Sequence, residues 1–404
     1  MKSTRGNWMV RWKRHYDDLS SPYAIRRYYD RAVVETTYNI IMAFWGNDFF
    51  EFDFLEKMRT NELHFVQALV FRPSVSAFYR LAEVSFLLDY ADRFNKEQYR
   101  LLTANKHDSE KVKDILCEVL LQYAFREAGI PYEANPMRGG QVLEGYCTLN
   151  GERFLVESKN KYSMKSDDFQ VICYVTARLM EFGRDMQTPN LGVGYIYFKH
   201  DNITEKDTHK MMAQLIEYLG DSSKVHLGGV FEDEHLRVVM KAGTAENYYE
   251  YHVGKKDADV DFFFKNTYEL NEKQNLIFNM HVGHRNSARK KDLVDRLMRT
   301  LKKARDQHKS DTSRGRIFCI FNEFLNDFQP PLLVDSEEFV KDVSQYLASK
   351  TTDDIVILID RRFNLSETFI KPHIMGHDHL LPYKRALWPI DYSIRRYLYG
   401  KVPF

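Results

Sequence analysis

Glu144, Glu157 and Lys159 have the residue types and spacing to place two carboxylates and an ammonium group at one site. Glu157 and Lys159 follow the apolar segment 154–156 and are separated by Ser158 alone. Side chains at positions i and i+2 of a β-strand point to the same face of a sheet. We therefore expect Glu157 and Lys159 to project together if this segment is a strand.

A hairpin is the element that must bring Glu144 to the same place. The segments 141–148 and 153–157 are strand-like and flank the step Asn150-Gly151. Asn-Gly is a strong signal for a tight hairpin turn, because both residues tolerate the positive φ that the turn requires. The hairpin would place Glu144 opposite Glu157.

Two carboxylates and a lysine together favour the chemistry of a hard divalent cation. Carboxylate oxygens suit Mg²⁺ or Mn²⁺, which keep several waters and also bind phosphate oxygens. Such a metal activates a bound water and neutralises charge on a phosphate under attack. We expect Lys159 to orient that water or to stabilise the transition state.

The surrounding elements are predicted from hydrophobic periodicity. A helix over 109–129 has one apolar face and ends at Gly129-Ile130-Pro131. A second helix is expected over 168–182 and a strand over 191–198. The predicted order is helix, two or three strands, helix, strand.

This order and these residues resemble the PD-(D/E)XK nuclease superfamily over residues 106–200. Glu157-Ser158-Lys159 matches the (D/E)-x-K motif of the family, and Glu144 falls where its first metal-binding aspartate stands. Position 144 departs from the family pattern, since it is Glu and no Pro precedes it. The resemblance implies Glu144 and Glu157 as catalytic metal ligands with Mg²⁺ or Mn²⁺, Lys159 as a catalytic residue, and the carbonyl of Ser158 as a further ligand.

The resemblance extends to both predicted helices. Many family members carry an acid on the first helix, which implies an auxiliary catalytic role for Glu118. RecB-like members carry Gln-x-x-x-Tyr on the second helix, and Gln170 and Tyr174 reproduce it, with Arg178 one turn further. In that subgroup these residues hold the DNA strand. A solvent-facing or boundary position on an ordinary helix is the alternative for each of them.

The charge of the whole chain does not select a partner. Lys+Arg (58) and Asp+Glu (57) almost cancel, so a nucleic-acid surface must come from a local patch. The region 285–316 has twelve Lys or Arg against four Asp, around an apolar helical stripe over 293–304. We predict phosphate contacts from this helix, although a solvated helix face is the alternative. The nucleic-acid-binding residues assigned to it are Arg289, Lys290, Lys291, Arg299, Lys302 and Lys303.

The length of 404 residues and the 44% hydrophobic content predict a mixed α/β protein with several parts. We expect a helical N-terminal region over 1–105, a restriction-endonuclease-like core over 106–200 (helix, three-stranded sheet, helix, strand), and an α/β accessory lobe over 201–404. That lobe should alternate strands over 275–281, 316–321 and 354–360 with helices over 288–309 and 336–349, before an irregular tail after residue 361.

The other features of the sequence give weaker predictions of a functional site. The four widely spaced cysteines indicate reduced, buried thiols. His373, His377 and His379 have a spacing that zinc could use, but structural or exposed positions are favoured. Asp354 and Asp360 are expected in solvent at strand ends. No apolar run has the length of a membrane helix, so a cytoplasmic protein without membrane contact is expected.

The sequence therefore predicts a metal-dependent nuclease, with DNA favoured over RNA as the nucleic-acid partner. Its accessory regions leave room for a homo-oligomer or a partner protein, and the fold analogy suggests bacterial restriction or anti-phage defence. A nuclease-fold protein that has lost cleavage and acts as a nucleic-acid-binding or scaffolding subunit is the main alternative. An interaction protein with an accidental E-x-K triplet is another.

Overall fold

The protein is described here by a computed structural model. The residues that it describes are 5–17, 31–60, 62–71, 75–135, 137–138, 141–142, 144–161, 174–175, 177–178, 181, 193–198, 204–220, 230–241, 278–279, 295, 298–303, 306, 313–322, 337–349, 353–363 and 368–390. Within them, no helix has the length and apolar character needed to cross a membrane.

Helices dominate the described part of the N-terminal region, as expected. They pack around a common apolar core, in which Trp12 stacks on Phe78 with ring centroids 5.5 Å apart. Their bounds are α1 (Trp8–Asp17), α2 (Arg31–Trp45), α3 (Phe54–Arg59), α4 (Phe65–Phe71), α5 (Val75–Phe94) and α6 (Lys96–Ala104), with the short elements β1 (Arg5–Asn7), η2 (Asp48–Phe50) and β2 (Glu51–Asp53).

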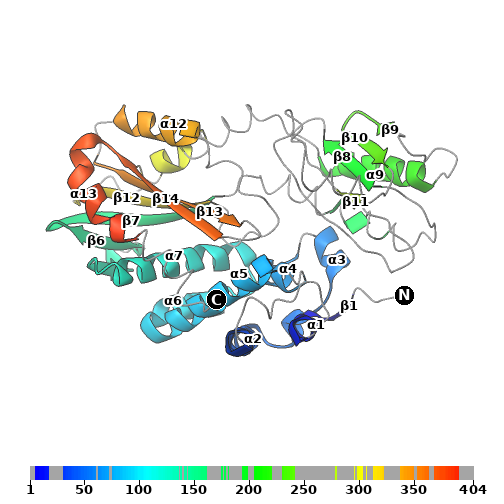
Figure 1. Cartoon of the computed structure of the whole chain (residues 1–404), viewed down its shortest axis with the longest axis horizontal. Helices are drawn as coiled ribbons and strands as arrows, with labels where there is room; N and C mark the ends of the chain where they lie inside the picture. Colours follow the sequence, from blue (N-terminus) through cyan, green and yellow to red (C-terminus); the bar gives the residue numbers. More distant parts are fainter. Residues whose placement is uncertain are drawn as a thin grey trace.

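The helix α7 (Ser109–Glu127) connects this bundle to the main sheet (Figure 1). The Asp108 side chain accepts a hydrogen bond from the backbone N–H of Lys111 and caps its start. Its end is marked by Gly129, whose φ of 69° suits a residue without Cβ. The predicted helix over 109–129 is confirmed. Its buried residues face strands on one side and α5 and α6 on the other.

The main sheet has six strands in the order β14-β13-β12-β7-β6-β3. Strands β7, β12 and β13 are parallel, while β3, β6 and β14 join antiparallel to their neighbours. The bounds are β3 (Tyr132–Ala134), β6 (Gly145–Leu149), β7 (Glu152–Lys161), β12 (Gly315–Asn322), β13 (Ile355–Phe363) and β14 (Thr368–Gly376).

The turn between β6 and β7 is the predicted Asn-Gly hairpin. Asn150 has φ 50° and Gly151 has φ 82°, the pair of positive values that such a two-residue turn needs. The expected strand over 141–148 is divided in two. Its first residues form β5 (Gln141–Val142), which pairs with β4 (Met137–Arg138) outside the main sheet. Of the two parts of the expected strand, β6 is the one that pairs with β7.

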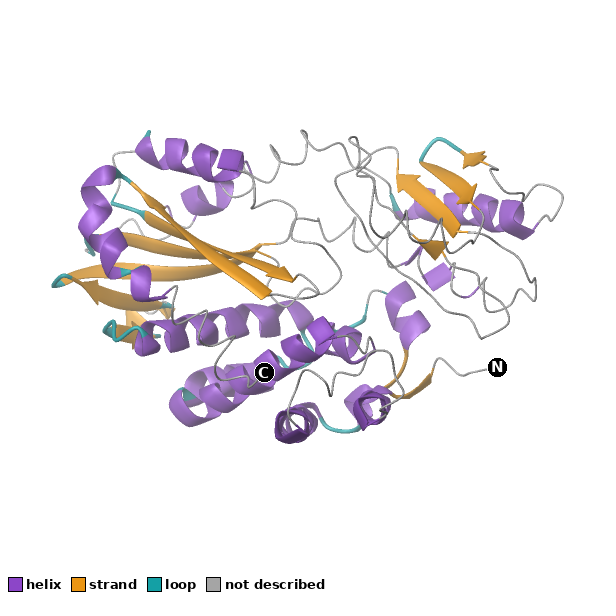
Figure 2. Ribbon diagram, viewed as in Figure 1, coloured by secondary structure: helices purple, strands orange, loops and turns teal. Residues whose placement is uncertain are grey.

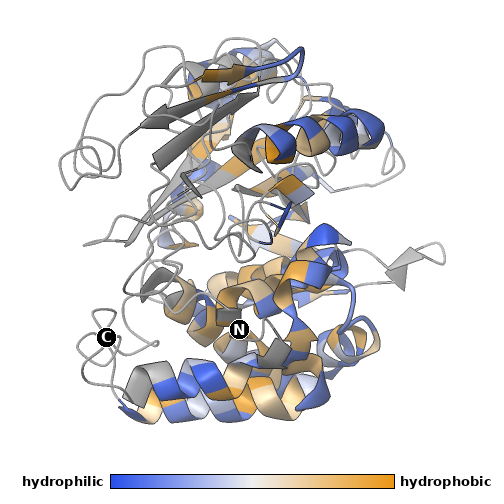
Figure 3. Ribbon diagram, turned by 90° about the vertical axis from the view of Figure 1, so that its right-hand side faces the viewer, coloured by the Kyte–Doolittle hydropathy of each residue, from blue (hydrophilic) through white to orange (hydrophobic). Residues whose placement is uncertain are grey.

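Each face of the main sheet is covered by helices, which makes a three-layer arrangement (Figures 1 and 2). Phe154, Val156 and Cys319 point into the core shared with α7 and the N-terminal helices. Phe318 and Ile320 point the other way, where they pack against Leu301 and α12 (Glu337–Ala348). The helices carry both hydrophilic and hydrophobic residues along their length (Figure 3), as a layer with one buried face requires.

The strand expected to complete the 106–200 core lies elsewhere. Residues Val193–Phe198 form β8 in a separate four-stranded sheet of order β11-β8-β10-β9. The place beside β7 is taken by β12, whose residues 317–320 are buried and apolar on both faces, as an internal parallel strand requires. The second sheet contains β9 (Val230–Glu232), β10 (Leu236–Lys241) and β11 (Phe278–Asn279), and it contacts α9 (Glu205–Gly220) through Tyr218 and Phe231.

The expectation of an irregular tail after residue 361 was wrong. The chain continues in β13, returns as β14, and then forms η3 (Asp378–Leu380) and α13 (Leu381–Ala386). Pro372 lies within β14, although proline cannot donate a hydrogen bond to a sheet. It is accommodated because β14 is an edge strand that pairs with β13 alone.

Candidate functional site

The candidate site lies where β6 and β7 separate, which we call the fork. Strand β6 begins at Gly145, opposite Val156, whereas β7 continues to Lys161. Continuing the register by one residue places Glu144 opposite Glu157. The pairing itself ends at Gly145, so the predicted relation between the two acids stays a prediction.

Hydrogen bonds hold Glu144 from two sides. The backbone N–H of Ser158 donates to Glu144 Oε2. The carbonyl oxygen of Glu144 accepts from the hydroxyl of Tyr132 at 3.2 Å and from the backbone N–H of Asn135 at 3.0 Å. The acid is thus fixed beside the residue that separates Glu157 from Lys159.

The E-x-K segment lies in an interior strand at this point. Glu157 and Ser158 are 4% and 6% exposed, and β12 runs alongside with Phe318 at the register position of Glu157. Lys159 pairs through its backbone with Ile320, and its side chain lies outside the described atoms. The N–H and C=O of one residue in a strand point towards the same neighbour. The carbonyl of Ser158 therefore faces the fork, like its N–H.

Glu118 reaches this region from α7. Its Oε2 accepts a hydrogen bond from the side-chain amide of Gln98 at 2.6 Å, and the same Gln98 nitrogen is 3.3 Å from Asn135 Oδ1. Asn135, with φ 52°, is the residue whose N–H binds the carbonyl of Glu144. A continuous set of contacts thus joins the predicted auxiliary acid to the fork.

Two buried groups between α7 and the sheet have raised pKa values, to which both Glu118 and Glu144 contribute. Burial raises the pKa of the Cys117 thiol well above its usual value, and the carboxylates of Asp114, Glu118, Glu83 and Glu144 raise it further. Burial also raises the pKa of the Tyr132 hydroxyl, and Glu144 and Glu118 add to that shift.

Gly145 allows Tyr132 to lie across the start of β6. A Cβ at position 145 would be 2.2 Å from the Tyr132 hydroxyl oxygen and 2.3 Å from its ring. Tyr132 also stacks on Phe125 of α7, with ring centroids 4.9 Å apart. A glycine at this position is therefore needed for the hydrogen bond from Tyr132 to Glu144.

The donor atoms at the fork are oxygens, which is the donor set that Mg²⁺ and Mn²⁺ prefer. They are the carboxylates of Glu144 and Glu157 and the carbonyl of Ser158. Glu144 Oε2 accepts a hydrogen bond from the backbone N–H of Ser158. Among the residues that the structure describes, no group of three or more His, Cys, Asp or Glu side chains is placed to hold a metal ion.

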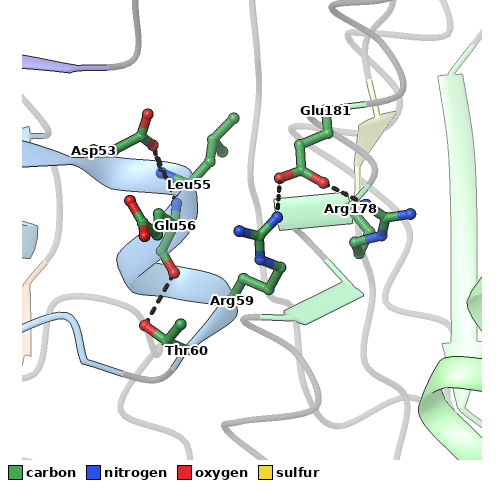
Figure 4. Close-up of polar contacts among 7 residues, drawn as sticks. All are labelled: Asp53, Leu55, Glu56, Arg59, Thr60, Arg178 and Glu181. Carbon is green, nitrogen blue, oxygen red and sulfur yellow. Dashed lines mark hydrogen bonds and ion pairs between the residues drawn. The ribbon is translucent and has the colours of Figure 1, made fainter.

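The predicted second helix contacts the N-terminal region and α9. Its described residues are helical, and Gln170 lies outside them. The ring of Tyr174 lies 4.7 Å from that of His209 on α9. Arg178 pairs with Glu181 at 2.6 Å, and Arg59 of α3 binds the same carboxylate at 2.9 Å (Figure 4). These contacts fasten the helix to α3, whose start is capped by Asp53.

The described part of the basic helix is placed as predicted. Leu301 is buried against the sheet, whereas Arg299, Lys302 and Lys303 are exposed. Arg289, Lys290 and Lys291 lie outside the described residues. Because Leu301 packs with Phe318, and Phe318 is the register partner of Glu157, the helix covers the face of the sheet to which Glu157 points.

The other titratable candidates lie at the opposite end of β7 and β12. His379 contacts His377 (Nδ1 to Nδ1, 2.8 Å) and Asp353 (Nε2 to Oδ1, 2.5 Å). The expectation that Asp354 is solvated was wrong, since it is 2% exposed and lies 3.7 Å from Arg316. The side chains of His373 and Asp360 are not described.

The prediction of reduced, buried cysteines is confirmed for the three cysteines that the structure describes. Cys117, Cys147 and Cys319 are free and buried, and Cys173 lies outside the described residues.

No family model, no curated protein and no solved structure matches this chain. The resemblance to PD-(D/E)XK nucleases therefore rests on the motif residues and on the elements that carry them.

Sequence reasoning missed three residues of the fork. Tyr132, Asn135 and Gln98 each bind a predicted acid or its backbone. The local signals were an asparagine suited to positive φ at position 135 and, at position 98, a glutamine one turn before Leu102 on the same face of α6. Neither signal names its partner, because the partners come from other elements.

Proposed function

We propose that this protein is a Mg²⁺- or Mn²⁺-dependent nuclease that hydrolyses phosphodiester bonds of nucleic acid at the fork. The observation that carries the proposal is the position of Glu144. Its carboxylate accepts the Ser158 amide, and the next residue, Gly145, pairs with Val156, which precedes Glu157. Glu144 thus lies beside the residue that separates Glu157 from Lys159, at the end of the hairpin where β6 begins.

Each residue has a role that follows from its chemistry. Glu144, Glu157 and the Ser158 carbonyl supply hard oxygen ligands, and Glu118 holds a water from the side of α7. Lys159 orients the attacking water and stabilises negative charge on the phosphate. A divalent metal, when bound, supplies the acidity that makes water a nucleophile at neutral pH.

The basic helix supports nucleic acid as the substrate. Arg299, Lys302 and Lys303 are exposed on a helix that covers the face of the sheet to which Glu157 points. Cations grouped in this way favour a polyanion through counterion release. DNA is our first choice of substrate and RNA the alternative, because the metal chemistry does not depend on the 2′-hydroxyl. Restriction or defence in a bacterial cytoplasm is the setting that we propose.

Cleavage assays with a matched lysine substitution test the function. Supercoiled plasmid, linear duplex, single-stranded DNA and RNA are each incubated with Mg²⁺, Mn²⁺ or EDTA. We expect metal-dependent cleavage that falls by at least about 100-fold in Lys159→Ala. Arg153→Ala is the control, because Arg153 is an exposed cation at the other end of β7 and pairs with Glu133. Equal activity of the two variants would exclude Lys159 from the reaction.

A subunit that binds nucleic acid without cutting it is the second candidate function. The observation that favours it is the hydrogen bond from Ser158 to Glu144, because a carboxylate can serve the fold in this way without holding a metal. Nucleic-acid binding without cleavage under every metal condition, and unchanged in Lys159→Ala, would support this function and overturn the nuclease.

A further inference from the structure

A glutamate on the predicted second helix binds arginines from two different elements. Arg59 Nη1 of α3 lies 2.9 Å from Glu181 Oε1, and Arg178 Nη1 lies 2.6 Å from Glu181 Oε2. Figure 4 shows the two guanidinium groups beside the one carboxylate. Two cations and one anion leave a net positive charge at this place. We call these three residues the arginine cluster.

Both arginines of the cluster keep hydrogen-bond donors that Glu181 does not use. The side chains of Arg59 and Arg178 are 41% and 37% exposed, whereas that of Glu181 is 15% exposed. A guanidinium has five N–H groups. Within the part of the chain that the structure describes, Glu181 is the one hydrogen-bond partner of each guanidinium. A ligand from solvent can therefore reach the arginines although their acid is largely covered.

The packing of the helix on α3 does not depend on two arginines. Ala177 belongs to an apolar cluster with Leu55 and Met58 of α3, which already joins the two elements. Partly exposed ion pairs add little to stability, because water and salt screen them. Guanidinium groups match the oxygens of phosphate as well as those of carboxylate. The Glu181 carboxylate thus occupies a place whose donors also suit a phosphate.

We infer that Arg59 and Arg178 bind one backbone phosphate of the nucleic acid, and this inference rests on the proposed function. Glu181 holds the two guanidinium groups together in the free protein and gives them up to the phosphodiester when the strand binds. The family resemblance implied a nucleic-acid contact for Arg178 alone. Arg59 and the competing acid are identified by the contact between α3 and the helix. The N-terminal region then takes part in substrate binding.

The test measures the binding of fluorescein-labelled oligonucleotides to the full chain by fluorescence anisotropy, in EDTA so that the strands stay intact. Duplex DNA, single-stranded DNA and RNA are compared over a series of salt concentrations. We expect Arg59→Ala to weaken binding roughly 3- to 10-fold. The dependence of log Kd on log salt should become less steep by about 1, because one phosphate contact is lost.

Glu181→Gln carries the opposite expectation and decides the matter. The amide keeps the shape of the side chain but removes the competing charge, so binding should become roughly 3- to 10-fold tighter. A merely structural cluster predicts the other sign, because loss of the ion pairs would loosen the helix from α3 and weaken binding in both variants.

Glu97→Gln is the matched control for the change of net charge. Glu97 is an exposed acid of α6 that pairs with Arg100 at 2.7 Å. Its neutralisation alters the charge of the chain by the same amount as Glu181→Gln, but it uncovers an arginine outside the cluster. The affinity of this control for each oligonucleotide should stay within about twofold of the wild type.

The outcomes separate this inference from the proposed function. A wild type that neither binds nor cleaves nucleic acid overturns both. A wild type that binds, with equal affinities in Glu181→Gln and Glu97→Gln, overturns the inference and leaves the nuclease standing. Weaker binding in both Arg59→Ala and Glu181→Gln also overturns it. If Arg59→Ala does not fold, Arg59→Gln replaces it, since it keeps a polar side chain without the charge.

A double-mutant cycle tests whether the acid acts through the arginines. In the background of Arg59→Ala, the gain in affinity from Glu181→Gln should be smaller than in the wild type, because one of the two guanidinium groups is absent. Equal gains in the two backgrounds would mean that Glu181 acts through long-range charge alone, and the inference would be wrong.

Discussion

His64 caps α4 with its ring and is kept neutral by its surroundings. The ring Nδ1 of His64 accepts a hydrogen bond from the backbone N–H of Val66 at 3.3 Å. The backbone N–H of His64 donates to Gln67 Oε1 at 3.1 Å. The arrangement is similar to a capping box, except that the ring bonds the second backbone N–H of the helix and not the third. The ring lies among Phe49, Trp45 and Phe65. Burial, with the nearby cation Lys113 in second place, lowers the pKa of His64 to about 3.

This histidine should make the fold sensitive to acid. The unfolded chain takes up a proton near pH 6.5, whereas the folded chain resists it until about pH 3. Stability that is present above pH 6.5 is therefore lost as the pH falls towards 3. Between pH 7 and pH 4 we expect a loss of about 3 kcal/mol from this group. Urea unfolding of the wild type and His64→Asn, which keeps a capping oxygen, measures the difference.

The control in this comparison is internal, because the carboxylates of the protein are the same in both variants. The wild type should lose about 3 kcal/mol more than His64→Asn over the same pH interval. Equal losses in the two proteins would show that His64 does not titrate as its burial requires.

At the scale of single residues, the sequence predicted the candidate acids but not the groups that contact them. Glu144 and Glu157 belong to a motif with a spacing that a hairpin explains. Gln98 belongs to no motif, and its hydrogen bond to Glu118 depends on how α6 packs against α7. Asp354 was misjudged for the same reason, since Arg316 on the neighbouring strand makes burial tolerable.

At the scale of elements, local signals were sufficient for α7 and for the turn of the hairpin. Periodicity, a capping aspartate and Gly129 define the helix, and Asn150-Gly151 defines the turn. The partner of β7 could not be derived in this way. Parallel pairing is set by contacts between distant segments, and both 191–198 and 315–322 have the composition of a buried strand.

The hairpin turn gives a prediction that isolates backbone conformation. Gly151 has φ 82°, and a Cβ added there would meet nothing within 4 Å. Gly151→Ala should therefore cost about 1 to 2 kcal/mol from left-handed strain alone. Asn150→Gly keeps a turn-compatible residue and should change stability by less than about 0.5 kcal/mol. Urea unfolding compares the two, and a tolerated alanine would contradict the turn geometry.

At the scale of the whole molecule, the main sheet combines segments on both sides of residue 200. Strands β3, β6 and β7 come from the predicted 106–200 core, and β12, β13 and β14 come from the predicted accessory lobe. The boundary at 200 remains a prediction about domains, but the six strands form one sheet with a helical layer on each face.

This topology predicts that residues 106–200 do not fold alone. The fragment lacks β12, so the long edge of β7 and the apolar side chains beside it would be exposed. We expect no cooperative thermal transition and poor dispersion of amide resonances, whereas the full chain should unfold cooperatively. A fragment with a cooperative transition would mean that β12 is not required for the core.

The pairing of β7 with β12 also sets the order of events during synthesis. Phe154 lies opposite Gly315, so about 160 further residues must leave the ribosome before β7 gains its parallel neighbour. At roughly 5–20 residues per second, that delay is on the order of 10 to 30 s. During this delay, the edge of β7 that will pair with β12 is exposed beside the completed β6–β7 hairpin. Nascent chains paused before residue 315 should therefore depend on chaperones, and the dependence should end once β12 has emerged.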